Sequence, residues 1–208
     1  MPRETPEAKL LRLTEIERPL WARGERVAGI DEVGRGPLAG PVVTACVIVP
    51  ESLLVPGVDD SKKLSEKKRE ALFGPLQEAA DYCRTCFIGP EVIDEINILN
   101  ATKRAMETCG ADFDGTFLID AVTGLHLPGE IRPLIHGDAL SYMIGAASII
   151  AKVTRDRYMI ELDEKYPMYG FARNKGYGTK EHIAALKKYG PCPEHRRSFI
   201  AGILGEKA

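Results

Sequence analysis

Val27-Ala-Gly-Ile-Asp-Glu-Val-Gly-Arg-Gly-Pro-Leu-Ala-Gly40 is the stretch around which the rest of the sequence is organised. Its apolar start predicts a buried strand over residues 26–31 that ends in two adjacent carboxylates, Asp31 and Glu32. A glycine-rich turn containing Arg35 follows, and β-branched residues over 42–49 predict a second strand. Carboxylates at the end of a buried strand are costly to desolvate unless something compensates them, and hard divalent cations do so because they prefer oxygen ligands.

Two other interpretations of this stretch exist. Adjacent Asp and Glu residues are commonly just solvated turn residues. The segment Gly34-Arg-Gly36-Pro-Leu-Ala39 also matches the dinucleotide fingerprint G-x-G-x-x-G/A. That fingerprint needs a helix after the glycines, whereas this chain continues through Pro41 into a predicted strand. The two carboxylates would also repel a pyrophosphate, so we reject dinucleotide binding.

Length and composition indicate one soluble domain. The 208 residues are 44% hydrophobic and 28% charged, which is ordinary for a globular protein. No apolar run approaches the roughly 20 residues of a membrane helix, and the first residues lack the apolar core of a signal peptide, so we expect a cytoplasmic protein. The odd number of cysteines, 5, argues against a disulfide framework. We interpret Cys83 and Cys86 as small buried hydrophobic residues, because no second C-x-x-C is present to complete a zinc site.

Charge is distributed unevenly along the chain. The net charge is −2, but residues 171–208 hold eight Lys or Arg against three Glu, a local charge of +5. Such an asymmetry is typical of a basic binding face beside an acidic site. A solvated surface gives the same count.

Hydrophobic periodicity, caps and turn residues predict the elements. A helix is expected over 6–22, and Ser65 is expected to cap a helix of about 15 residues. Further helices are expected over 90–110, 139–165 and 180–189, and further strands over 82–88, 116–119 and 131–135. Two of these strands lead into acids, Asp120 and Asp138.

Taken singly, each acid has a structural explanation. Asp138 can be only the N-cap of the long helix, and Asp120 only a turn residue. Taken together, acids that directly follow several apolar strands predict convergence on a pair of Mg²⁺ or Mn²⁺ ions about 4 Å apart, which suits phosphodiester hydrolysis. Adjacent residues on a straight strand point to opposite faces, so Asp31 and Glu32 can share one site only if the backbone turns at Val33-Gly34.

The sequence also resembles a known family, bacterial ribonuclease HII, over about residues 27–199. The segments that carry the resemblance are Gly29-Ile-Asp-Glu-Val-Gly-Arg-Gly-Pro-Leu-Ala-Gly-Pro-Val43, Asp60-Ser-Lys-Lys-Leu64, Glu95-Ile-Asn-Ile-Leu99, Leu118-Ile-Asp120, Gly137-Asp138, Ala146-Ala-Ser-Ile-Ile-Ala-Lys-Val-Thr-Arg-Asp156, Lys175-Gly-Tyr-Gly-Thr179 and His195-Arg-Arg-Ser-Phe199.

The resemblance implies an α/β, ribonuclease H-like fold: a central mixed five-stranded sheet flanked by helices, with a helical C-terminal extension. It implies a single catalytic domain over 1–208, with a core and N-terminal helix over about 1–168 and a basic substrate-binding extension over about 169–208. No obligate protein partner is evident and a monomer is the default expectation.

The implied activity is that of an endoribonuclease. It hydrolyses the RNA strand of RNA–DNA hybrids and incises duplex DNA at single ribonucleotides, leaving 5′-phosphate and 3′-hydroxyl ends, with Mg²⁺ or Mn²⁺. The implied catalytic and metal-binding residues are Asp31, Glu32, Asp120 and Asp138. The implied substrate-binding residues are Gly34, Arg35, Gly36, Lys62 and Tyr177.

The sequence departs from the family at two positions, and two alternatives stay open. Ala121 stands where the family usually has Gly, and His136 where it usually has Lys; we interpret His136 as a phosphate contact or a positional accident rather than a proton donor. Ser148, Lys152, Thr154, Arg155 and Asp156 are explained by a packed helix with internal ion pairs.

The two alternative functions are a non-catalytic hybrid-binding module of the same fold and a metal-dependent phosphatase acting on small esters.

Overall fold

A mixed sheet of five strands forms the centre of the protein, in the order β3-β2-β1-β4-β5. The computed structural model describes residues 4–205, so the ends of the expected domain, 1–3 and 206–208, lie outside the described residues. Strand β1 pairs antiparallel with β2 and parallel with β4, so the sheet is mixed as predicted. The strands are β1 (Val27–Val33), β2 (Val42–Ile48), β3 (Tyr82–Ile88), β4 (Thr116–Asp120) and β5 (Glu130–Leu134).

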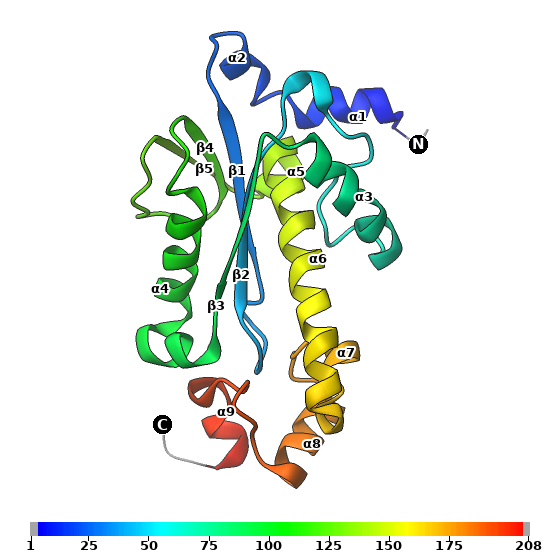
Figure 1. The fold of residues 1–208 in the computed structure, drawn as a ribbon, viewed down its shortest axis with the longest axis vertical. Coiled ribbons are helices and arrows are strands. Elements are labelled where there is room, and N and C mark those ends of the chain that lie inside the picture. Colours follow the sequence, from blue (N-terminus) through cyan, green and yellow to red (C-terminus); the bar gives the residue numbers. More distant parts are fainter. Residues whose placement is uncertain (1–3, 206–208) are drawn as a thin grey trace.

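Helices cover both faces of this sheet, as Figure 1 shows. They are α1 (Pro6–Leu13), α2 (Arg18–Trp21), α3 (Glu66–Ala79), α4 (Pro90–Gly110), α5 (Gly137–Leu140), α6 (Tyr142–Lys165), α7 (Phe171–Asn174), α8 (Lys180–Tyr189) and α9 (Arg197–Leu204), with short 3-10 turns η1 (Glu51–Leu53) and η2 (Pro167–Tyr169). Helix α6 packs on one face and α4 on the other, which gives an α/β fold of three layers.

The core follows the alternation of side chains along the strands. Val27 and Leu118 belong to the cluster under α6, whereas Ala28 and Phe117 belong to the cluster on the other face. Helix α6 approaches β1 very closely at Gly29, where an added Cβ would lie 2.1 Å from the backbone carbon of Met143. Gly29, two residues before Asp31, is therefore required by the packing of α6 on the sheet.

The predicted helix over 6–22 is wrong in one respect, because it is two helices. The chain turns between α1 and α2, and Glu17 from this turn is buried. Its Oε1 accepts hydrogen bonds from the Ser141 hydroxyl at 2.6 Å and from the Met143 N–H at 3.1 Å. The turn thus supplies an acceptor to the start of α6, which a continuous surface helix does not do.

The predicted helix over 139–165 is also two helices. The hydroxyl of Ser141 accepts a hydrogen bond from the Ile144 N–H at 3.2 Å, so Ser141 is the N-cap of α6. Asp138 lies in the preceding short helix α5 and therefore does not cap the long helix. The predicted strands, the Ser65 cap of α3 and helix α8 are confirmed within a residue or two, and all five cysteines are free.

The C-terminal segment returns to the hairpin loop that joins β1 and β2. Ala39 forms an isolated antiparallel bridge with His195, and the Gly40 N–H donates to the Glu194 carbonyl at 2.8 Å. In Figure 1, α8 and α9 lie at the far end of the molecule from α2. The segment therefore covers the loop end of the β1–β2 hairpin.

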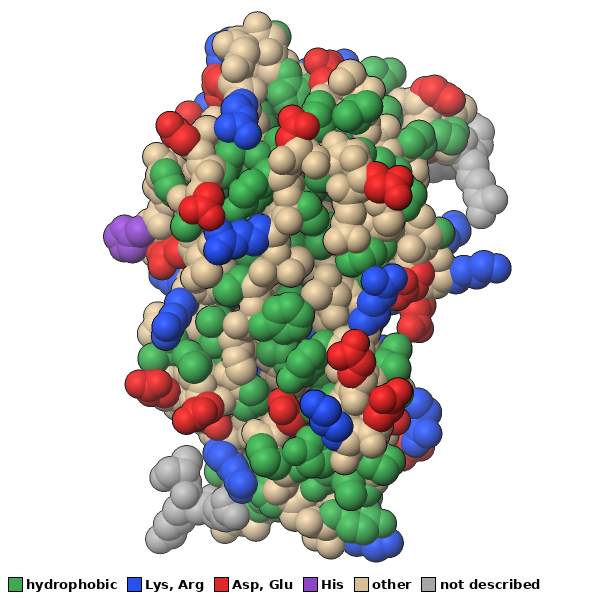
Figure 2. Space-filling view, viewed as in Figure 1, with side chains coloured by type: hydrophobic (Ala, Val, Ile, Leu, Met, Phe, Trp, Pro, Cys, Tyr) green, Lys and Arg blue, Asp and Glu red, His purple; other side chains and the backbone are tan. Residues whose placement is uncertain are grey.

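The surface view agrees with the low net charge. In Figure 2, acidic and basic side chains are mixed over the face shown, with hydrophobic side chains between them. Phe87 on the edge strand β3 is among the exposed hydrophobic residues, with its ring centroid 5.7 Å from that of Tyr158. Among the helices described, none is both long enough and apolar enough to cross a membrane.

Candidate active site

The adjacent acids Asp31 and Glu32 lie near the end of β1 and approach it from opposite faces. The register with β2 is regular through both residues, so their side chains alternate, with Asp31 on the α6 side. The turn considered at Val33-Gly34 is present and follows both acids: β1 runs on to Val33, and the chain turns at Gly34 with φ +92°. The two carboxylates therefore reach the end of the sheet from different sides.

Asp120 and Asp138 join Asp31 at the same edge of the sheet. Ile30 pairs with Ile119 across the parallel strands, which makes Asp31 and Asp120 neighbours at the next position. The Oδ1 of Asp120 accepts a hydrogen bond from the Gly137 N–H at 2.8 Å. Because Gly137 directly precedes Asp138, this bond draws the fourth acid to the end of β4.

These acids are crowded and poorly solvated. Burial, followed by the charges of Glu32 and Asp120, raises the pKa of Asp31 well above its usual range, while the hydroxyl of Ser148 acts in the opposite direction. Burial likewise raises the pKa of Glu32, and Arg35 partly offsets it. The Oε2 of Glu32 is buried with no hydrogen-bond partner among residues 4–205. The fold thus crowds several carboxyl groups at this edge and leaves Glu32 Oε2 without a partner among the described residues.

The described residues contain no group of three or more His, Cys, Asp or Glu side chains arranged to hold a metal ion. Three of the acids are engaged instead by groups of the protein: Asp138 by Lys62, Glu32 by Arg35 and Asp120 by the Gly137 N–H. The donor set nevertheless fits a hard divalent cation, because carboxylate oxygens are its preferred ligands and Glu32 Oε2 has no partner within the protein.

Lys62 reaches the acidic edge from the loop before α3. Its Nζ lies 3.0 Å from Asp138 Oδ2, although 79% of its side chain is exposed. Hydrogen bonding to Asp138 raises the pKa of Lys62, with further contributions from Asp31 and Asp60. An exposed ammonium next to a buried carboxylate is free to exchange partners, since such an ion pair contributes little to stability.

The Gly34-Arg35-Gly36 turn lies directly beyond the acids. Gly34 combines a positive φ with a close contact, because an added Cβ would lie 2.3 Å from Arg155 Nε. Gly36 has neither constraint: its φ is not positive and an added Cβ would meet only Tyr177 Cε1, at 3.8 Å. Nothing within the described protein explains the glycine at 36, which favours close approach of a ligand there.

Tyr177 lies beside this turn although the two are far apart in the sequence. It occupies the loop between α7 and α8 and is 44% exposed. The Tyr177 carbonyl is held by His182 Nδ1 at 2.9 Å, and His182 Nε2 lies 3.0 Å from His195 Nε2. A buried histidine pair therefore supports the backbone of this loop.

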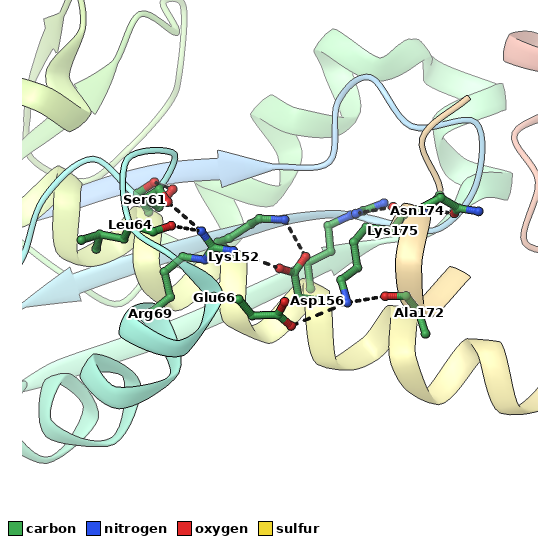
Figure 3. Close-up of polar contacts among 12 residues, drawn as sticks. Ser61, Leu64, Glu66, Arg69, Lys152, Asp156, Ala172, Asn174 and Lys175 are labelled. Atoms are coloured by element: carbon green, nitrogen blue, oxygen red, sulfur yellow. Dashed lines mark hydrogen bonds and ion pairs between the residues drawn. The ribbon is translucent and has the colours of Figure 1, made fainter. Parts of the chain in front are cut away.

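Several residues of α6 act differently from the predicted internal ion pairs. Lys152 does pair with Asp156 at 2.6 Å, as Figure 3 shows, and Arg69 of α3 joins them at 3.8 Å. Ser148 instead faces Asp31, with its hydroxyl 2.7 Å from that of Ser61.

Arg155 also differs from the predicted internal ion pairs, because its guanidinium donates to loop carbonyls rather than to a carboxylate. The small, apolar neighbours of Ser148 indicate a buried position, whereas Arg155 lies between Thr154 and Asp156 and the sequence gives no local signal for its contacts.

The two departures from the family pattern fall on residues with left-handed backbone. Ala121 has φ +50° and His136 has φ +59°. A left-handed conformation is strained for residues with a Cβ, which explains why glycine is usual at the first of these positions. His136 is exposed, and no side-chain hydrogen bond of His136 occurs within residues 4–205.

Comparison with known proteins gives consistent matches. The family model "Ribonuclease HII" matches residues 28–201. A ribonuclease HII of Ruminiclostridium cellulolyticum is 50% identical over 200 residues, which cover 94% of this chain and 78% of that protein.

Solved structures agree with this match. The ribonuclease H2 of Pyrococcus horikoshii superposes with a TM-score of 0.73 at 28% identity, over 86% of this chain and 97% of that chain. A Bst-RNase HIII in complex with Mn²⁺ has the same fold, with a TM-score of 0.59 at 16% identity, over 80% of this chain and 63% of that chain. The chain belongs to the ribonuclease HII family and is a ribonuclease H-type endonuclease of α/β fold.

Proposed function

We propose that this enzyme cuts the RNA strand of RNA–DNA hybrids and also incises duplex DNA at a single ribonucleotide, with Asp31, Glu32, Asp120 and Asp138 as its metal-binding residues. In this reaction an oxygen of water bonds to phosphorus and the bond to the 3′-oxygen breaks, which leaves 5′-phosphate and 3′-hydroxyl ends. The observation that carries the proposal is the meeting of acids from β1, β4 and α5 at one sheet edge, where Asp31 and Asp138 are buried and Glu32 Oε2 has no hydrogen-bond partner among residues 4–205.

Ribonucleases H depend on divalent cations, and we propose two Mg²⁺ or Mn²⁺ ions for this one. Such ions, when bound, lower the pKa of the attacking water and neutralise the leaving oxygen. The Mn²⁺ in the complex of Bst-RNase HIII supports the choice of metal by likeness of fold alone. Asp138 can exchange Lys62 for a cation at little cost, because that lysine is exposed and an exposed ion pair contributes little to stability.

We propose that the Gly34-Arg35-Gly36 turn and Tyr177 read the ribose. RNA differs from DNA at one sugar hydroxyl, so discrimination needs polar groups close to the 2′ position. Gly36 permits that approach and its neighbour Tyr177 is exposed beside it. The Arg35 guanidinium has only donors and its side chain is 45% exposed, which suits it to the scissile phosphate rather than to an acceptor on the sugar.

Lys62 and the C-terminal extension are the proposed contacts to the nucleic acid backbone. Lys62 borders the acids and, once released from Asp138, carries a free charge for phosphate. The extension over about 169–208 combines its local positive charge with a position against the hairpin loop. We propose it as the substrate-binding part of a single domain.

One assay tests the proposal. The enzyme is incubated with three labelled duplexes, namely an RNA–DNA hybrid, a DNA duplex with one ribonucleotide and its all-DNA twin, each with Mg²⁺, with Mn²⁺ and with a chelator. We expect cleavage of the first two only, only with metal, and with a 5′-phosphate on the product.

The same assay separates the alternatives. Binding without cleavage of the hybrid at any metal concentration would mean a non-catalytic hybrid-binding module. Hydrolysis of p-nitrophenyl phosphate at a rate matching that on the hybrid would favour a phosphatase. Cleavage of the hybrid but not of the single-ribonucleotide duplex would remove the second half of the proposal.

A further inference from the structure

The loop between β1 and β2 is held by hydrogen bonds from the side chain of Arg196, a residue that is 0% exposed. Its Nη2 donates to the Gly34 carbonyl at 2.6 Å and its Nη1 to the Arg35 carbonyl at 2.9 Å. Its Nε and Nη2 donate to the Gly40 carbonyl at 3.0 and 2.8 Å. One planar guanidinium therefore joins the start of the loop to its end.

Among the described residues, carbonyl oxygens and the ring of Phe199 are the groups that compensate this cation. No carboxylate within 4–205 forms an ion pair with Arg196, or with the neighbouring Arg155, which is also 0% exposed. Burial, and then the charge of Arg155, lowers the pKa of Arg196 to about 9, which still leaves it charged at neutral pH. A buried cation without an ionic partner is costly, so its presence beneath this loop needs a reason beyond packing.

The direction of the bonded carbonyls fixes the direction of the N–H groups. In a planar trans peptide the C=O of one residue and the N–H of the next point in opposite directions. Because the carbonyls of Gly34 and Arg35 point down to Arg196, the N–H groups of Arg35 and Gly36 point away from it. Both residues are exposed, and neither N–H donates a hydrogen bond to any described residue.

We propose that Arg196 is a positioning residue for ribose recognition: by holding the Gly34 and Arg35 carbonyls inward, it presents the Arg35 and Gly36 N–H groups to the substrate. Two adjacent donors aimed outward suit the lone pairs of a 2′-hydroxyl. This inference rests on the proposed role of the Gly34-Arg35-Gly36 turn in reading the ribose.

The substitution Arg196→Lys keeps the positive charge but loses the planar, forked arrangement of N–H donors. An ammonium group is a compact donor on a flexible stem, whereas the guanidinium spans three acceptors in one plane. Arg196 is itself held in place, since its N–H donates to the Leu38 carbonyl at 2.9 Å and its guanidinium lies 5.1 Å from the centre of the Phe199 ring. The geometry of this one side chain thus sets the orientation of the turn.

The test is the preference for a ribonucleotide in binding. Dissociation constants are measured for a DNA duplex with one ribonucleotide and for its all-DNA twin, in an Asp138→Asn background that prevents cleavage. The ratio of the two constants cancels any loss of folded protein. We expect Arg196→Lys to lower the preference at least fivefold, by weakening the ribonucleotide duplex more than its twin.

Two charge-conserving controls bracket this variant. Arg197→Lys changes the neighbouring exposed arginine and should alter neither the preference nor the melting temperature. Arg155→Lys changes the other buried arginine, which donates to the carbonyls of Pro41, Ala39 and Lys175 but not to those of the turn. It should lower the melting temperature, with the preference the same as that of the parent.

The possible outcomes are distinct. An unchanged preference in Arg196→Lys, or an equal loss in Arg155→Lys, would overturn the assignment. If Arg196→Lys does not fold, Phe199→Leu, which loosens the support of the guanidinium, is expected to lower the preference about threefold, and no change there would overturn it equally. Should the parent bind both duplexes alike, or Gly36→Ala keep the full preference, the proposed ribose reading itself fails, independently of Arg196.

Discussion

Asp31 and Asp138 at one end of the site, and Arg155 and Arg196 at the other, are all less than a tenth exposed. The acids lie on regular strands and a short helix, held there by backbone pairing. The arginines support an irregular loop through side-chain hydrogen bonds to its carbonyls, beside a few backbone contacts from the C-terminal segment. Charge at the acids is left for a ligand to compensate, whereas charge at the arginines is compensated by carbonyls within the fold. Removing the charge of an acid should therefore impair catalysis, whereas removing the charge of a buried arginine should impair folding.

The largest expected effect is at the acidic end. We predict that Asp138→Asn lowers the rate of hybrid cleavage by several orders of magnitude, because the metal-binding set acts as a unit. The melting temperature in metal-free buffer should not fall, since a crowded like charge is removed. Initial rates in Mg²⁺ and thermal melts by circular dichroism measure the two effects. Asp81→Asn, an exposed acid, is the control; comparable rates for both variants would contradict the metal assignment.

The opposite pattern is expected at the arginines. We predict that Arg155→Met lowers the free energy of unfolding by about 3 kcal/mol, because the carbonyls of Ala39, Pro41 and Lys175 lose a buried donor. Urea denaturation measures it. Arg157→Met, on the exposed side of the same helix, should cost less than about 1 kcal/mol. Equal losses of unfolding free energy in the two variants would mean that the buried hydrogen bonds of Arg155 add nothing to stability.

A smaller effect concerns the histidine pair under Tyr177. Burial lowers the pKa of His195 from its usual 6.5 to about 4, and burial also lowers that of His182. The unfolded chain therefore binds protons that the folded chain does not, so stability is present above pH 6.5 and is lost as the pH falls towards 4. Each proton contributes a slope of about 1.4 kcal/mol per pH unit.

Urea denaturation between pH 7 and pH 4 measures this slope. The double variant His182→Gln/His195→Gln should have a shallower pH dependence than the parent protein. His126→Gln, which changes an exposed histidine, should leave the dependence as it is. Identical slopes in all three proteins would show that the pair is not neutral in the folded state.

Substitutions at Tyr177 test the role of this loop without changing the residues that hold its backbone. We predict that Tyr177→Ala lowers cleavage at a single ribonucleotide by tenfold or more, about 1.4 kcal/mol in the transition state. The metal dependence should stay unchanged, and Tyr177→Phe separates ring contact from hydrogen bonding. Tyr189→Ala removes another exposed tyrosine and serves as the control. Full activity of Tyr177→Ala would remove this residue from the site.

The smallest expected effect is on salt dependence. Each phosphate contact contributes just under one unit to the slope of log affinity against log salt concentration. We predict that Lys62→Gln reduces this slope by about one unit for hybrid binding, whereas Lys63→Gln, beside it and paired with Asp60, leaves it nearly unchanged. A slope that is the same in both variants would mean that Lys62 serves only Asp138.

The sequence by itself determined the strands and most helices and indicated the four acids as candidates, because these depend on local patterns. Apolar runs that lead into Asp31, Asp120 and Asp138 predict carboxylates at strand ends, and parallel pairing then brings two of them together. The breaks at Thr14–Glu17 and Ser141 were missed, since both depend on Glu17 capping a helix more than a hundred residues away.

Only the tertiary structure decided how the turn after Asp31 is held. Arg155 and Arg196 have ordinary local surroundings in the sequence, and nothing local indicates that both end beneath residues 34–41. The proximity of Gly36 to Tyr177 is equally non-local. Side-chain hydrogen bonds to an irregular loop follow no period, so they appear only when distant segments are packed together, whereas alternation along a strand is written in consecutive residues.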